Sequence, residues 1–69
     1  MNIETFVVEA REEQSLESFK FEMFYALNDI KKYHEQDYSF SLAPVYGVFN
    51  DELYVVYPWA KSIDDIDTF

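Results

Sequence analysis

One stretch decides the fold: residues 15–35 read SLESFKFEMFYALNDIKKYHE. Its apolar residues recur in steps of three and four, which is the spacing that places side chains on one side of an α-helix. On a helical wheel, this apolar group covers an arc of roughly 120°. The group consists of Leu16, Phe19, Met23, Ala26, Leu27, Ile30 and Tyr33. The stretch is therefore predicted to form one long amphipathic helix that turns this group toward the core.

The ends of this helix carry residues that helix ends favour. Ser15 is the predicted N-cap, because its hydroxyl can accept a hydrogen bond from a free backbone N–H. Glutamates around it place negative charge near the positive end of the helix dipole, and Lys31 and Lys32 place positive charge near the other end. We therefore expect the helix to run from Leu16 to about Glu35.

The opposite side of the same helix is also aromatic. Phe21 and Tyr25 lie one turn apart on that side, and Phe24 lies beside them. Aromatic patches of this kind are enriched at protein interfaces. We therefore predict that these three residues bind a partner. The alternative is that the apolar stripe is wide and that they belong to the core.

Further segments have the pattern of β-strands. Residues 3–10 are dense in β-branched and aromatic residues, and residues 38–42 alternate apolar and polar side chains up to the interruption at Pro44. Residues 45–57 read as a hairpin around Asn50 and Asp51, because Asn and Asp tolerate the positive φ angles of a two-residue turn.

A two-residue turn determines which hairpin residues face each other. It places Phe49 opposite Glu52 and Gly47 opposite Tyr54. One sheet face then holds Tyr46, Val48, Leu53, Val55 and Tyr57, and the other holds Val45, Phe49, Tyr54 and Val56. Both faces are apolar, although only one helix is available to cover them.

These elements predict an α+β fold in the order β-α-β-β, with residues 1–60 as a single domain. We expect a three-stranded, mainly antiparallel sheet with the long helix packed across one face. If the helix makes a right-handed crossover, the first strand runs parallel to its neighbour. Residues 61–69 are predicted to be an acidic C-terminal tail, in which Ser62 and Asp65 resemble a capping box. The tail fits two descriptions: a short helical turn docked on the uncovered sheet face, or a disordered segment that folds on a partner.

The composition argues against most catalytic chemistry. The chain has no cysteine, one glycine and one histidine, so a thiolate metal site, a glycine-rich phosphate loop and a histidine cluster are excluded. The one glycine, Gly47, lies in a predicted strand rather than at the turn of a calcium-binding loop. His34 is better explained as a residue that closes the end of the core. We therefore expect no enzymatic activity, no catalytic residue, no metal and no cofactor.

The charge balance bears on the partner. With 14 acidic and 5 basic residues, the formal net charge is −9, which repels nucleic acid and anionic membranes and favours a basic protein partner. DNA mimicry would be partial, because a duplex about 30 Å long carries on the order of 18 negative charges. The N-terminus has no signal-peptide pattern and no apolar run is long enough to cross a bilayer, so we expect a cytoplasmic protein.

The sequence thus indicates a small acidic protein-binding module, an inhibitor or adaptor such as viruses and mobile elements encode, which docks on a basic, nucleic-acid-binding site of its partner. Seven Phe, six Tyr and one Trp exceed what one helix on a short sheet can bury. The predicted partner-binding residues are Phe21, Phe24, Tyr25, Tyr54, Trp59, Asp64, Asp65, Asp67 and Phe69. The alternative is a structural homo-oligomer or a small subunit of a larger assembly.

Overall fold

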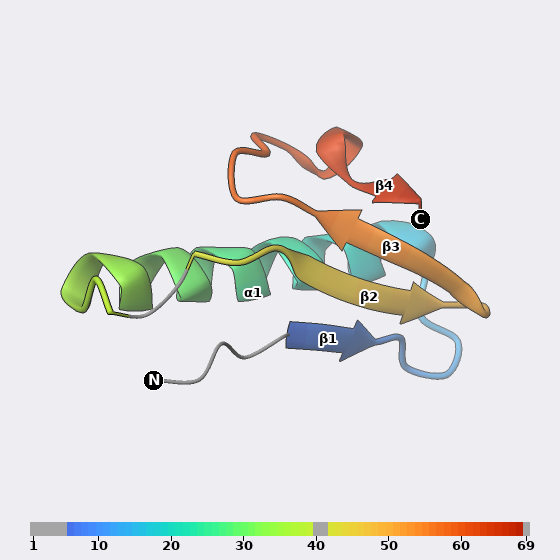
Figure 1. Cartoon of the computed structure of the whole chain (residues 1–69). Helices are drawn as coiled ribbons and strands as arrows, with labels where there is room; N and C mark the ends of the chain where they lie inside the picture. Colours follow the sequence, from blue (N-terminus) through green and yellow to red (C-terminus); the bar gives the residue numbers. More distant parts are fainter. Residues whose placement is uncertain (1–5, 40–41, 69) are drawn as a thin grey trace.

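A four-stranded mixed sheet lies against one long helix in the structure, a computed structural model that describes residues 6–39 and 42–68 (Figure 1). In chain order the elements are β1 (Phe6–Glu9), α1 (Leu16–Gln36), β2 (Val45–Phe49), β3 (Glu52–Val56), the 3₁₀ turn η1 (Ile63–Asp65) and β4 (Asp67–Thr68). The strands lie in the order β1-β2-β3-β4. The α+β class is confirmed, but the sheet has four strands and mixed directions where three mainly antiparallel strands were expected.

Helix α1 begins where its cap predicts. The Ser18 N–H donates to the Ser15 hydroxyl at 3.1 Å, which confirms Ser15 as the N-cap. The buried side of the helix is shorter than expected, because Leu16 and Tyr33 at the two ends of the predicted apolar group are 37% and 54% exposed. A helix of 21 residues is about 31 Å long, whereas a five-residue strand spans about 17 Å. The helix therefore extends beyond the sheet at its C-terminal end (Figure 1), and its buried residues lie between Phe19 and Ile30.

The hairpin between β2 and β3 confirms the predicted register. Phe49 pairs with Glu52 and Gly47 pairs with Tyr54 in an antiparallel ladder. Asn50 and Asp51 both have positive φ angles, 50° and 64°, as the favoured two-residue hairpin turn requires. The two apolar faces of the hairpin are therefore those that the sequence predicts.

Strand β1 runs parallel to β2, with Phe6 opposite Val45 and Glu9 opposite Val48. This confirms the expectation of a parallel first strand, since α1 makes the crossover between them. The strand was predicted over residues 3–10. It spans Phe6–Glu9 in the structure, and residues 3–5 lie outside the described residues.

The strand predicted over residues 38–42 is not among the described elements. Tyr38 and Ser39 instead form a turn directly after α1, in which the Asp37 carboxylate accepts bonds from the Ser39 N–H and hydroxyl at 3.0 and 2.7 Å. Short polar side chains that bond the nearby backbone compete in this way with sheet formation. Phe40 and Ser41 lie outside the described residues.

The fourth strand comes from the acidic tail. The capping box of Ser62 and Asp65 is confirmed and begins η1. After it, Ile66 is buried in the core, and β4 pairs antiparallel with β3. The tail is therefore an ordered turn and strand rather than a disordered segment. One of the two descriptions drawn from the sequence placed the tail on the sheet face that the helix leaves uncovered. In the structure η1 contacts α1 instead, and β4 adds a strand beside β3.

The core lies between α1 and one sheet face, and its closest approach is at Gly47. A Cβ atom at this position would lie 2.5 Å from Phe19 Cζ and 2.7 Å from Met23 Sδ. Phe19 also packs against Phe49 and Tyr54, with ring centroids 5.3 and 5.8 Å away. The missing side chain of Gly47 thus provides the space in which the helix packs on the sheet.

The substitution Gly47→Ala tests this packing. Because the added methyl group has no space, we expect the free energy of unfolding to fall by about 1–3 kcal/mol, the usual cost of overpacking a core. Denaturant unfolding monitored by circular dichroism measures the change. In a Phe19→Leu background the same substitution should cost less, because the ring tip is absent. An unchanged or raised stability in the wild-type background would contradict the close approach.

Candidate functional site

The side of the sheet that faces away from α1, here called the uncovered face, keeps large apolar residues at the surface. The alternation of the strands places Tyr46, Val48, Leu53, Val55 and Tyr57 on it, together with Val7 of β1. Val7 is 54% exposed, and Val48 and Leu53 are each 38% exposed. The uncovered face is therefore an apolar surface of the kind that partner proteins cover.

A stacked aromatic pair extends this face where β3 ends. Tyr57 follows β3, and Pro58 stops the ladder because it has no N–H to donate. The Ala60 N–H donates to the Tyr57 carbonyl at 3.0 Å, which closes a turn with Pro58 at its favoured position. This turn brings Trp59 back onto Tyr57, with ring centroids 4.9 Å apart and planes 5° apart. Trp59 remains 75% exposed.

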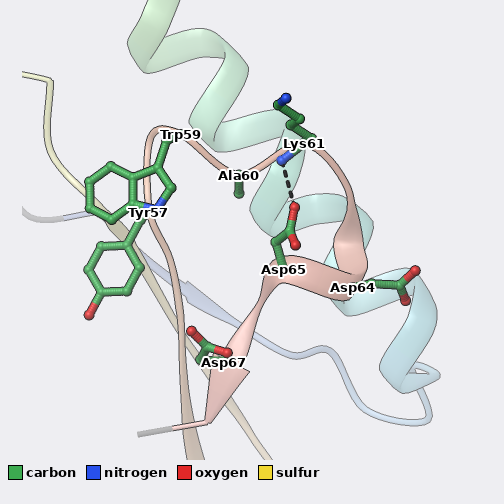
Figure 2. Close-up of a pocket in the computed structure, with 7 residues that line it drawn as sticks. All are labelled: Tyr57, Trp59, Ala60, Lys61, Asp64, Asp65 and Asp67. Atoms are coloured by element: carbon green, nitrogen blue, oxygen red, sulfur yellow. Dashed lines mark hydrogen bonds between the residues drawn. The ribbon is translucent and has the colours of Figure 1, made fainter.

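An open cavity of about 430 Å³ lies between this aromatic pair and the acidic tail. Its lining consists of Tyr57, Trp59, Ala60, Lys61, Asp64, Asp65 and Asp67. Figure 2 shows Asp67 on the same side of the cavity as the Tyr57 ring, and Asp64 pointing outward on the opposite side. The tail therefore places an exposed carboxylate, that of Asp67, close to an exposed aromatic surface.

Asp65 has a structural role in the tail. Its Oδ2 atom accepts the backbone N–H groups of Lys61 and Ser62 at 2.8 and 3.2 Å (Figure 2). These bonds hold the chain between Trp59 and β4 in its turn. Asp65 thus positions the tail, and its carboxylate is already engaged within the protein.

A second hollow of about 440 Å³ adjoins the first. It is lined by Val55, Tyr57, Asp67 and Thr68, so it shares Tyr57 and Asp67 with the first cavity. Asp67 pairs with Val55 across the β3–β4 ladder, which places its side chain on the uncovered face. We call Val55, Tyr57, Trp59 and Asp67 together the β3–β4 surface. Val55 lines its base and is 2% exposed, so what this surface presents is the aromatic pair and the Asp67 carboxylate.

The structure divides the predicted partner-binding residues between two surfaces. Trp59, Asp64 and Asp67 lie around the β3–β4 cavity. Phe21 and Tyr25 lie on the outer side of α1, where they are 43% and 64% exposed. Because α1 covers one face of the sheet, its outer side is turned away from the uncovered face (Figure 1). The two groups therefore do not form one continuous site.

Three other predicted residues stand apart. Tyr54 is buried in the core, 7% exposed, because the register turns it toward α1; the structure places it in the fold rather than on a contact surface. Phe24 is partly buried and packs against the same core, so it offers less surface than Phe21 and Tyr25. Phe69 lies outside the described residues.

Tyr57 belongs to the site but is not among the predicted partner-binding residues. The sequence places it on the same sheet face as Tyr46, Val48 and Val55, without indicating which of the two faces the helix covers. Pro58 directly after it indicates that the strand ends in a turn, but no sequence pattern gives the direction in which that turn sends Trp59.

Within residues 6–39 and 42–68, no three His, Asp or Glu side chains are grouped as metal ligands would be. The same part of the chain contains no helix with the length and apolarity of a membrane span. Comparison of the whole chain with protein families, with curated proteins and with solved structures found no match. The site must therefore be interpreted from its own chemistry.

The role of Asp65 can be tested by replacing it with alanine. We expect Asp65→Ala to weaken the tail by about 1 kcal/mol, the typical loss for a helix cap. The measurement is amide hydrogen exchange at Lys61 and Ser62, which should become faster. Asp64→Ala is the matched control, because Asp64 takes part in the cap through its backbone N–H. Equal exchange in the two variants would show that the Asp65 carboxylate does not hold the tail.

The burial of Tyr54 in the core can be tested by measuring its titration. Burial first, and then the charge of Glu52, which accepts the Tyr54 hydroxyl bond at 3.2 Å, raise the pKa of Tyr54 above 10.0. Since the folded-state pKa is the higher one, the stability from this group is complete below the unfolded pKa. It is lost as the pH rises through the folded-state pKa.

We expect the ring-carbon NMR signal of Tyr54 to titrate at higher pH than that of a free tyrosine. Glu52→Gln should move its pKa back toward the ordinary value, whereas Asp51→Asn, the same change of charge in the adjacent turn, should move it less. A Tyr54 pKa at the ordinary value in the folded protein would contradict its burial against α1.

Proposed function

We propose that this protein is a small, non-enzymatic binding module, an inhibitor or adaptor that docks on a basic site of a partner protein. The observation that carries the proposal is the β3–β4 surface, where Trp59 is 75% exposed and stacks on Tyr57. Tryptophan is highly buried on average in folded proteins, and it is enriched among the residues that dominate the binding energy of interfaces. This surface continues into the apolar uncovered face.

The charge of the chain supports a basic partner. A formal net charge of −9 attracts a cationic surface and accelerates docking more than it adds affinity. Sites that bind nucleic acid are basic, so the protein would act there as a partial mimic of DNA, with about half the charge of a duplex of similar length. Small size and high acidity are also typical of inhibitors from viruses and mobile elements, and a cytoplasmic location fits such a role.

The second candidate is a homo-oligomer or a subunit of a larger assembly. It is favoured by the exposure of Val7, Val48 and Leu53 on the uncovered face, because a second copy could cover the same residues on both partners. The two candidates differ in what covers this face, which is a different protein in the first and a second copy of the chain or another subunit in the second. Light scattering separates them: a stable dimer at micromolar concentration supports this candidate, and a monodisperse monomer opposes it.

Affinity capture from a lysate of the native host tests the first candidate. We expect the wild-type protein to retain a specific basic protein. The double variant Trp59→Ser with Asp67→Asn should bind it about tenfold more weakly, in the range expected for losing an interface tryptophan. Both side chains are exposed, so the fold should persist, and circular dichroism checks this.

The matched control replaces the other exposed aromatic pair, Phe21→Ser with Tyr25→Ser. This variant should retain the partner if docking occurs at the β3–β4 surface. Loss of the partner in this control alone would move docking to the outer side of α1, which is the other surface that the sequence predicts. Retention of no specific protein by the wild type would contradict the binding function itself.

A further inference from the structure

We propose that the β3–β4 surface recognises an arginine side chain of the partner, whose guanidinium stacks on the exposed face of Trp59 while the Asp67 carboxylate, which lines the same hollow, attracts its charge. This inference rests on the proposed function and names the chemical group that the site would take. It concerns one contact within the docking surface and commits to a protein segment as occupant.

The geometry of the aromatic pair leaves one ring face for a ligand. Tyr57 and Trp59 are nearly parallel, 5° apart, with centroids at 4.9 Å. Tyr57 therefore covers one face of the indole, and with 75% of Trp59 exposed the other face is accessible. Tryptophan has the strongest attraction for a cation above its ring, and a flat guanidinium can lie parallel to it.

The charges around this ring select a cation. Asp67 lines both hollows of the surface and has its backbone held in the β3–β4 ladder, so its carboxylate is offered from a fixed strand. Asp64 adds negative charge on the other side of the cavity. The one cation in the lining, Lys61, is separated from the two rings by Ala60 in Figure 2. The site therefore presents an aromatic face next to a net negative charge.

Arginine fits this combination better than the other candidates. A lysine ammonium is a strongly hydrated point charge and cannot stack as a plane. A nucleic acid base could stack on Trp59, but its phosphates would meet a chain of net charge −9. A guanidinium can lie flat on the ring while its charge is attracted by the carboxylates that line the hollow.

The chain contains one tryptophan, so its fluorescence reports on Trp59 alone. We would titrate the wild-type protein with the blocked peptide acetyl-Gly-Arg-Gly-Arg-Gly-amide and compare it with the same peptide carrying lysine. We expect a saturable change in Trp59 fluorescence with the arginine peptide, several times weaker binding of the lysine peptide, and weaker binding at high salt.

Two variants of equal charge complete the experiment. Asp67→Asn should weaken binding of the arginine peptide about threefold, as expected for losing an exposed ion pair. Asp29→Asn, which removes an exposed carboxylate from α1, should leave it nearly unchanged. Equal binding of the two peptides, or equal effects of the two variants, would overturn the inference, because attraction would then depend only on total charge.

The outcome is distinguishable from that of the proposed function. If the peptide does not change Trp59 fluorescence while capture of a partner still depends on Trp59, the arginine contact is wrong and the binding function stands. If the arginine peptide binds through Asp67 but the wild-type protein retains no specific protein from the lysate, the chemistry of the site is supported and the proposed function is contradicted.

Discussion

The close approach of α1 to the sheet at Gly47 sets the positions of the other elements. Phe19 and Met23 enter the space that a side chain would fill, and Phe19 then contacts both strands of the hairpin through Phe49 and Tyr54. A larger residue at position 47 would lift the helix and separate these rings. The core is therefore organised around the side chain that Gly47 lacks.

This one-sided packing explains the character of the surface. Among residues 6–39 and 42–68, one helix covers one face of the sheet and no second layer covers the other, although the alternation of β2 and β3 supplies apolar residues to both. The excess is partly absorbed within the chain: Val55 is 2% exposed, and Trp59 covers one side of Tyr57. What remains outside is aromatic, apolar and next to carboxylates, which is the combination from which we derive the binding role.

Sequence patterns predicted the parts of this fold that depend on local chemistry. The N-cap at Ser15, the hairpin register around Asn50 and Asp51, and the capping box in the tail each follow from a few neighbouring residues, and all are confirmed. The predictions that were wrong failed because a local hydrogen bond competes with strand formation in one place and because tertiary contacts create a strand in another. Asp37 bonds the backbone where a strand was expected, and β4 forms only because η1 packs on α1 and returns the chain to β3. Of the site, Trp59 and Asp67 were predicted, whereas the stacking partner Tyr57 depends on a turn whose direction no pattern specifies.

The outer edge of β3 has a further consequence. A strand edge with free N–H and C=O groups can recruit strands from other molecules, which is how many sheets begin to aggregate. Strand β4 occupies part of that edge and is only two residues long, Asp67 and Thr68. If further copies paired at this edge, the Asp67 carboxylates of adjacent copies would lie close together and repel one another. A very short edge strand with a charged side chain is one of the features by which proteins discourage such pairing, and here it lies beside an apolar sheet face.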